Sequence, residues 1–158
     1  MQQNKLNFLI FGFGNPARCD DALGILLADN LQEWALQNKI PGILTDTNYQ
    51  LNIEDSYAMQ FADVVIFADA TVDPRIENFS MERVKPSAKI TFSLHTTSPA
   101  YLLHMCNELY HKNPVTYILQ IRGYQWELKD GLSPKASKNL KEATKYLRER
   151  IEVTIKKK

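Results

Sequence analysis

Apolar runs and amphipathic runs alternate along most of this chain. The segment 6–11, which contains the apolar run Phe8-Leu9-Ile10-Phe11, predicts a buried strand, and the segment 42–47 predicts a second one. The segment 63–69 is the clearest strand, because the consecutive apolar residues at 64–68 indicate burial on both faces, as in the centre of a parallel sheet. Further β-rich runs at 78–84 and 115–121 predict two more strands.

Helical periodicity fills the segments between these strands. The stretch 20–37 carries apolar residues on one helical face, namely Leu23, Leu27, Leu31 and Trp34, with Ala28 and Ala35 beside them. A last helix begins near Ser133 and carries the core stripe Ala136, Leu140, Ala143, Leu147 and Ile151.

Capping residues predict where three of the helices begin. Ser98-Pro99 and Ser133-Pro134 each place a serine cap before a proline that suits the first helical position. Leu102, Cys106 and Leu109 share a face of the helix that follows Ser98. Asn52 is expected to cap a further short helix.

The alternation of strands and helices predicts an α/β fold with a mainly parallel sheet covered by helices on both faces. With 158 residues, no repeat and no Pro-, Gly- or Ser-rich linker, residues 1–158 are expected to form one domain. Oligomeric state cannot be predicted from this pattern.

Composition narrows the classes of function. The net charge is +1, so no basic field attracts nucleic acid or an anionic membrane. No run reaches the ~18 apolar residues of a membrane-spanning helix, and no signal peptide precedes the first strand. Two cysteines are too few for a disulfide framework. We therefore expect a cytoplasmic protein that binds neither nucleic acid nor membranes.

Polar residues that could carry chemistry follow the predicted strands. Asp20 and Asp21 lie at the turn after the first strand, Asp69 ends the third, and His95 lies in a polar loop before a helix. The carboxyl ends of parallel strands meet at one edge of a sheet, where sites of α/β proteins lie. Two carboxylates and an imidazole suit a divalent transition metal.

Each of these residues also has a simpler interpretation. Asp20 or Asp21 could be a helix cap, Asp69 could accept bonds from the next turn, and a loop histidine such as His95 could be solvated. Cys19 could be a nucleophile at a helix N-terminus, although the neighbouring carboxylates disfavour a thiolate. Cys106 is expected in the core.

Two loop segments leave alternatives open. Arg18 could orient a carboxylate or be solvated, and the segment 122–126 could form a protein-docking rim or an ordinary loop. The turn that begins at Gly12 also satisfies G-x-G-x-x-A, the dinucleotide fingerprint, with Asp46 as a candidate for the ribose-binding acid. However, Asp20 and Asp21 would crowd the position of the pyrophosphate.

The segment 12–24, GFGNPARCDDALG, resembles the N-terminal signature of the hydrogenase maturation endopeptidases. The likeness continues in VIFADA at 65–70, in Ser93-Leu94-His95 and in Gly131-Leu132-Ser133-Pro134. The resemblance implies a single three-layer α/β/α domain with a twisted, mainly parallel sheet of about five strands. Where Ala22 stands, many members have glycine, and where Asp21 stands they often have glutamate or aspartate.

The resemblance also implies an activity and a set of site residues. It implies an aspartic-type endopeptidase that removes the C-terminal peptide from the large-subunit precursor of a nickel-iron hydrogenase. Asp21, Asp69 and His95 would be both the catalytic residues and the metal ligands, with nickel supplied by the substrate and no cofactor bound tightly. Two alternatives stay open: a dinucleotide-binding oxidoreductase, and a non-catalytic partner in hydrogenase assembly.

Overall fold

The computed structural model describes residues 5–90 and 97–157. Its five strands are β1 (Phe8–Phe13), β2 (Ile43–Asn48), β3 (Val64–Thr71), β4 (Phe79–Arg83) and β5 (Val115–Arg122). Its helices are the 3-10 turn η1 (Cys19–Ala22), α1 (Leu23–Gln37), α2 (Asp55–Met59), α3 (Pro99–Tyr110) and α4 (Pro134–Lys156).

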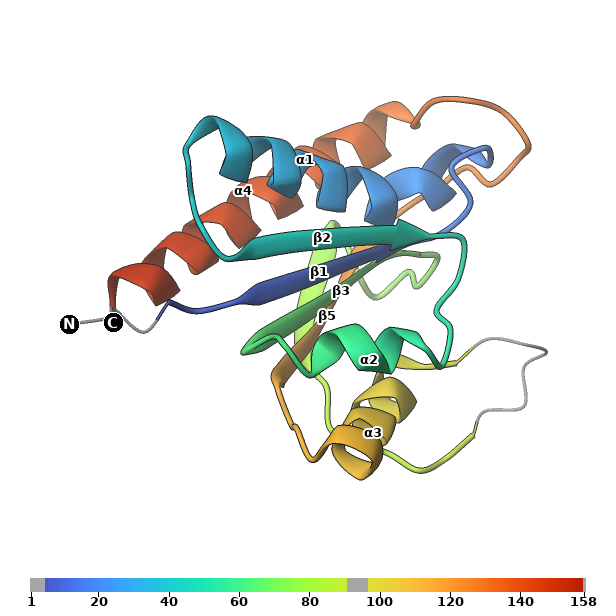
Figure 1. Cartoon of the computed structure of the whole chain (residues 1–158). Helices are drawn as coiled ribbons and strands as arrows, with labels where there is room; N and C mark the ends of the chain where they lie inside the picture. The colour runs from blue at the N-terminus through green and yellow to red at the C-terminus, as the bar shows by residue number, and fades with distance from the viewer. Residues whose placement is uncertain (1–4, 91–96, 158) are drawn as a thin grey trace.

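The strands form one sheet in the order β2-β1-β3-β5-β4. Four of them are parallel and only the edge strand β4 runs antiparallel, against β5. Helices α1 and α4 cover one face of the sheet, and α2 and α3 cover the other (Figure 1). The predicted α/β/α architecture with five strands is therefore confirmed.

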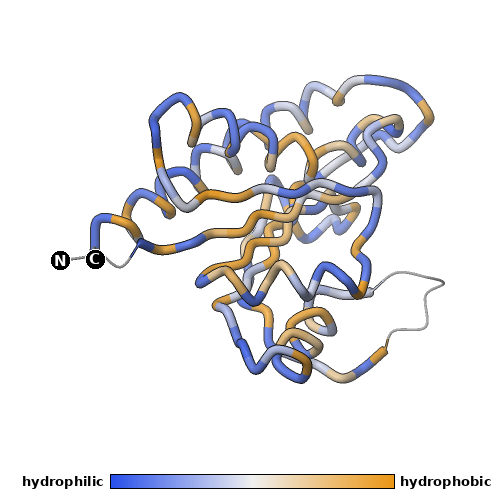
Figure 2. Tube along the Cα trace, in the orientation of Figure 1, coloured by the Kyte–Doolittle hydropathy of each residue, from blue (hydrophilic) through white to orange (hydrophobic). Residues whose placement is uncertain are grey.

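Two apolar cores lie on the two faces of this sheet. One joins α1 and α4 to the sheet and contains Leu27, Leu31 and Leu147, and the other joins α2 and α3 to it and contains Met59 and Leu102. Apolar residues concentrate along the inner strands (Figure 2). β3 lies between β1 and β5 and has a side on each core, which explains its unbroken apolar run.

Both serine caps are confirmed. The Ser98 hydroxyl accepts the Tyr101 N–H at 3.1 Å, and the Ser133 hydroxyl accepts the Ala136 N–H at 3.3 Å. The predicted stripes of α1 and α4 are also buried throughout. Within 5–90 and 97–157, no helix is long and apolar enough to cross a membrane.

Two local predictions are wrong. Asn52 does not cap α2, because the residue before the helix is Glu54, and the Asn52 backbone N–H instead donates to the Asp55 carboxylate at 2.7 Å. Leu109 is 54% exposed, while Leu103 is buried beside Leu102 and Cys106. The interface of α3 with the sheet is rotated toward Leu103, a detail that periodicity over one short helix does not resolve.

Candidate active site

Two glycines bring the turn after β1 close to the sheet. A Cβ on Gly12 would lie 2.3 Å from the Gly24 carbonyl oxygen, and a Cβ on Gly24 would lie 2.2 Å from the Ala68 carbonyl oxygen. These contacts involve backbone atoms, so only glycine fits at either position. The close packing places the start of α1, and the η1 turn before it, directly against the carboxyl ends of β1 and β3.

Asp21 lies in this turn. Its Oδ2 accepts the Asn15 backbone N–H at 2.8 Å, which holds the carboxylate over the glycine turn. Gly14 closes the turn with a φ of 140°, and a Cβ there would meet the Asp21 carbonyl oxygen at 2.1 Å. Asp21 remains partly exposed, and in the described part of the chain its other carboxylate oxygen has no hydrogen-bond partner.

Asp69 lies in β3, which extends two residues beyond it to Thr71 rather than ending there as predicted. Its Oδ1 accepts the Ala70 backbone N–H at 2.8 Å. Its second oxygen has no partner among residues 5–90 and 97–157. Asp21 and Asp69 thus each present one unused oxygen at the carboxyl edge of the sheet.

The electrostatics of Asp69 differ from those of an ordinary aspartate. Burial raises the pKa of Asp69 from 3.8 to about 7, and the negative charge of Asp21 also raises it, while the Ala70 N–H opposes the shift. The influence of Asp21 indicates that the two carboxylates lie within electrostatic reach of each other. A buried carboxyl group beside another carboxylate is a common feature of functional sites. A bound proton or cation offsets both the loss of hydration and the repulsion between the two negative charges.

Asp20, in contrast, is fully buried and structural. Its Oδ2 accepts the N–H groups of Tyr124 and Gln125 at 2.7 and 2.9 Å, and the Ser133 hydroxyl at 2.7 Å. Its Oδ1 accepts the Ser133 N–H at 2.8 Å. Burial acts to raise the pKa of Asp20, but these four hydrogen bonds outweigh it and lower the pKa.

The cap hypothesis is therefore wrong for both aspartates. The residue before η1 is Arg18 and the residue before α1 is Ala22, and neither helix start has a side-chain cap. Asp20 instead holds the loop 123–133, and Asp21 holds the turn. Ser133 was expected only as a helix cap, and nothing in the local sequence linked its hydroxyl to a residue 113 positions earlier.

Further hydrogen bonds attach the loop 123–133 to the turn. The Cys19 N–H donates to the Lys129 carbonyl at 2.9 Å, and the Lys129 N–H donates to the Ala17 carbonyl at 3.0 Å. The exposed Arg18 side chain donates through Nε to the Trp126 carbonyl at 3.1 Å. Arg18 and the segment 122–126 thus connect the turn after β1 to the loop 123–133, and both of these segments border the site.

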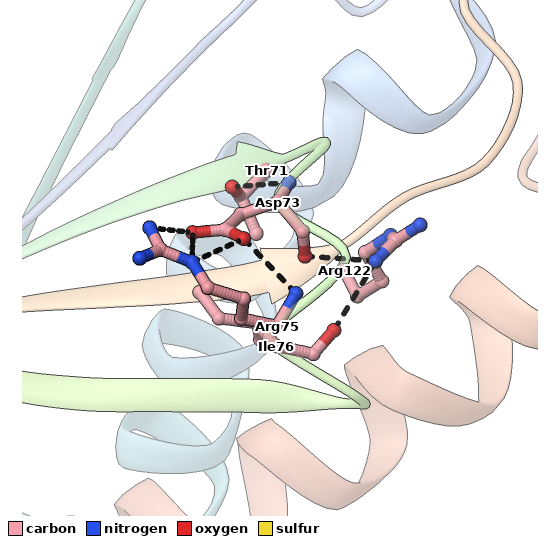
Figure 3. Close-up of polar contacts among 5 residues, drawn as sticks. All are labelled: Thr71, Asp73, Arg75, Ile76 and Arg122. Carbon is pink, nitrogen blue, oxygen red and sulfur yellow. Dashed lines mark hydrogen bonds and ion pairs between the residues drawn. The ribbon is translucent and has the colours of Figure 1, made fainter.

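The segment after β3 is held just as firmly (Figure 3). Asp73 forms an ion pair with Arg75 at 2.7 Å, and its N–H donates to the Thr71 hydroxyl at 3.2 Å. Arg122, which pairs with Thr71 in the sheet, donates to the carbonyls of Asp73 and Ile76 at 2.7 and 3.4 Å. These bonds connect the ends of β3 and β5 and support the position of Asp69.

Cys19 is buried and has a φ of 43°. Its Sγ donates to a Glu127 carboxylate oxygen at 3.6 Å. Burial, this hydrogen bond and the negative charges of Glu127 and Asp20 raise the pKa of the Cys19 thiol. A thiol held protonated is a poor nucleophile, which argues against a catalytic role. Cys106 is buried in the core as predicted.

The geometry also argues against a dinucleotide at this turn. The N–H groups that would receive a pyrophosphate are occupied, since Asn15 donates to Asp21, Cys19 to Lys129 and Asp20 to Gln125. The unused Asp21 oxygen would repel the phosphate. Asp46, the candidate for binding ribose, is exposed on β2 and accepts the N–H of its own neighbour Thr47 at 2.9 Å.

His95 lies outside the residues that the structure describes, so its predicted place beside Asp21 and Asp69 stays a prediction. Among the described residues, no group of three His, Cys, Asp or Glu side chains could hold a metal ion. The structure thus supplies two carboxylates with unused oxygens, and a third protein ligand would have to come from elsewhere.

The five-stranded sheet, its helices and the position of the turn after β1 define the fold of the hydrogenase maturation endopeptidases. Solved structures of proteins with that description superpose on almost the whole chain. No protein-family model and no curated protein matches the chain.

Three of these structures illustrate the similarity. The hydrogenase maturating endopeptidase HybD from Escherichia coli has a TM-score of 0.74 and 17% identity, over 94% of each chain. The [NiFe] hydrogenase maturation protease HycI from Thermococcus kodakarensis has a TM-score of 0.71 and 20% identity, over 93% of each chain. HybD from the same archaeon has a TM-score of 0.68 and 14% identity, over 91% of this chain and 98% of its own.

Proposed function

We propose that this protein is an endopeptidase that removes the C-terminal peptide from the nickel-loaded large-subunit precursor of a nickel-iron hydrogenase. The arrangement of Asp21 and Asp69 carries the proposal. Two carboxylates from distant parts of the sequence each present an unused oxygen at one edge of the sheet. The fold shared with hydrogenase maturation peptidases supports the same function.

In this proposal the precursor's nickel is part of the substrate. Carboxylate and imidazole ligands suit divalent nickel, so Asp21, Asp69 and His95 would bind it when the precursor docks. A bound cation polarises a neighbouring carbonyl and lowers the pKa of a water molecule, which are the two effects that peptide hydrolysis requires. A precursor without nickel would lack this contact and would be rejected.

The raised pKa of Asp69 adds a condition to docking. Near neutral pH much of Asp69 is protonated, and a cation must displace that proton in order to bind. Nickel recognition should therefore strengthen as the pH rises from about 6 to about 8. We also propose that this reaction takes place in the cytoplasm.

The direct test uses the purified full chain and a nickel-loaded precursor, with release of the peptide followed by mass spectrometry. We expect cleavage by the wild type and its loss in the variants Asp21→Asn, Asp69→Asn and His95→Ala. Asp29→Asn, which changes an exposed carboxylate on α1, is the matched control and should cleave normally. Undiminished cleavage by Asp69→Asn and His95→Ala would contradict the proposed ligands.

The same experiment separates the alternatives. A stable complex with the precursor, without any release of peptide, would indicate a non-catalytic assembly partner. A change in the fluorescence of Trp34 or Trp126 on titration with NAD or NADP would indicate a dinucleotide-binding oxidoreductase. We expect peptide release rather than a stable complex. We also expect no dinucleotide binding, since the N–H groups of the glycine turn are already occupied.

A further inference from the structure

A cavity of about 340 Å³ lies at the amino edge of the sheet, opposite the edge that carries Asp21 and Asp69. Its walls come from the starts of three parallel strands, from β4 and from the second half of α4. The volume falls at the lower end of the ~300–1,000 Å³ typical of small-molecule sites. This cavity is separate from the candidate active site and has no role in the proposed reaction.

The floor of the cavity is apolar. Phe8 and Ile66 from the sheet and Leu147 and Ile151 from α4 form this floor, and all four side chains are packed in the core. The partly exposed side chains of Leu6, Val64 and Tyr117 line the cavity above them. Met81 of β4 also lines the cavity. Leu147, Ile151 and Thr154 recur at helical spacing, so one face of α4 forms the wall opposite the sheet. Such a space favours an aliphatic chain over a polar ligand.

One positive charge, that of Arg150, lines the same cavity. The guanidinium lies over the rings of Tyr117 and Tyr146, 5.6 and 5.7 Å from their centroids, and donates to the Tyr146 hydroxyl at 2.9 Å. These contacts restrain the side chain. A guanidinium has five N–H donors, and within 5–90 and 97–157 no carboxylate lies within 4.0 Å of Arg150.

Asp63 is the acidic residue of the cavity wall. Its Oδ2 accepts the Asn7 backbone N–H at 2.8 Å, and its own N–H donates to the Asn7 carbonyl at 2.8 Å. Asp63 therefore joins the starts of β1 and β3. Among the described residues, the Arg150 guanidinium donates to no backbone carbonyl. It therefore remains available to a ligand whose two carboxylate oxygens match its N–H groups.

We propose that this cavity binds a small amphipathic carboxylate, of the class of medium-chain fatty acid anions. The aliphatic chain lies in the cavity over this apolar floor, and the carboxylate accepts hydrogen bonds from Arg150. Bidentate pairing between a guanidinium and a carboxylate gives both orientation and affinity. The held position of Arg150 over two tyrosine rings reduces the entropy that the side chain loses on binding.

Isothermal titration of the full chain with octanoate tests the proposal. We expect saturable binding of one molecule per chain, at least tenfold weaker binding of octanol, and no saturable binding of acetate. Octylamine, which carries the opposite charge, should also bind at least tenfold more weakly than octanoate. Absence of saturable octanoate binding, or equal binding of octanol, would overturn the proposal, and tighter binding of octylamine would assign the site to Asp63 instead.

Two variants of α4 localise the site. Arg150→Gln should weaken octanoate binding at least tenfold, whereas Lys141→Gln, which removes the same charge from an exposed position, should bind like the wild type. Circular dichroism verifies that both variants are folded. If Arg150→Gln does not fold, Arg150→Lys serves in its place, with weaker octanoate binding expected because an ammonium group lacks the planar fork.

A second copy of the chain is the other occupant that an apolar cavity could accept. Sedimentation measurements with and without octanoate distinguish the two. We expect the same sedimentation behaviour in both, because the ligand binds within one chain. A dimer that octanoate dissociates, and that Arg150→Gln also disrupts, would show that the cavity is an interface and would overturn the proposal.

Discussion

Ser133 donates both its backbone N–H and its hydroxyl to the buried carboxylate of Asp20, at 2.8 and 2.7 Å. The same hydroxyl accepts the Ala136 N–H and so caps α4. One serine therefore connects the turn after β1, the loop 123–133 and the last helix. Because Asp21 is the next residue along the chain, this connection also sets the position of the candidate ligand.

Asp20→Asn should destabilise the protein by about 3 kcal/mol. An asparagine has one acceptor oxygen where Asp20 uses two, so its amide group would face N–H donors that are left without a partner in a buried site. Chemical denaturation at pH 7 measures the loss. Asp29→Asn, an exposed control in α1, should change the stability by less than about 0.5 kcal/mol. Equal stability of Asp20→Asn and wild type would contradict this role.

Asp69→Asn should stabilise the protein at alkaline pH. The folded chain raises the pKa of Asp69 from 3.8 to about 7, so folding favours the protonated form. Stability is therefore unaffected below about pH 4, falls as the pH rises toward 7, and stays low above it. Three pKa units at ~1.36 kcal/mol each set an upper bound of about 4 kcal/mol for the gain in the variant.

Denaturation curves from pH 4 to pH 9, in a chelating buffer, provide the measurement for Asp69→Asn. The variant keeps an acceptor for the Ala70 N–H, so its stability should be nearly independent of pH through the range in which the wild type declines. Asp46→Asn, which changes an exposed carboxylate on β2, should decline like the wild type. Parallel curves for Asp69→Asn and wild type would show that Asp69 titrates normally.

Gly12→Ala and Gly24→Ala should each cost about 3 kcal/mol. An added methyl group would lie 2.3 or 2.2 Å from a backbone carbonyl oxygen, and the backbone can move only by separating α1 from the sheet. Gly131→Ala is the matched control, because Gly131 has a φ of 96° but no atom within 4 Å of an added Cβ. It should lose only ~1–2 kcal/mol, the cost of the backbone conformation alone.

Cys19→Ser should leave peptide release unchanged. The thiol is buried and its pKa is raised, so the proposed reaction does not depend on a thiolate there. The assay of peptide release from the nickel-loaded precursor provides the measurement. In the folded wild type, iodoacetamide should modify Cys19 far more slowly at pH 7 than in the unfolded chain. Loss of activity in a folded Cys19→Ser variant would restore Cys19 as a candidate nucleophile.

The sequence by itself determined the architecture. The unbroken apolar run of β3, the stripe of α4 and the two serine-proline starts are local signals, and local signals suffice because each element must bury its apolar face against the same sheet. The sequence also indicated that Asp21 follows one parallel strand and that Asp69 lies at the carboxyl end of another, which places them at one edge. Where a helix is short, as with α2 and α3, the local signal misplaced a cap and one buried leucine.

Only the tertiary structure decided which of the two adjacent aspartates is structural and which is the candidate ligand. Asp20 and Asp21 are adjacent and chemically identical, and no local pattern separates them. The loop 123–133 surrounds Asp20 with four donors and leaves an oxygen of Asp21 free, because successive residues of a tight turn point in different directions. A hydrogen bond between residues 20 and 133 depends on how two distant segments pack, and that is a property of the whole fold.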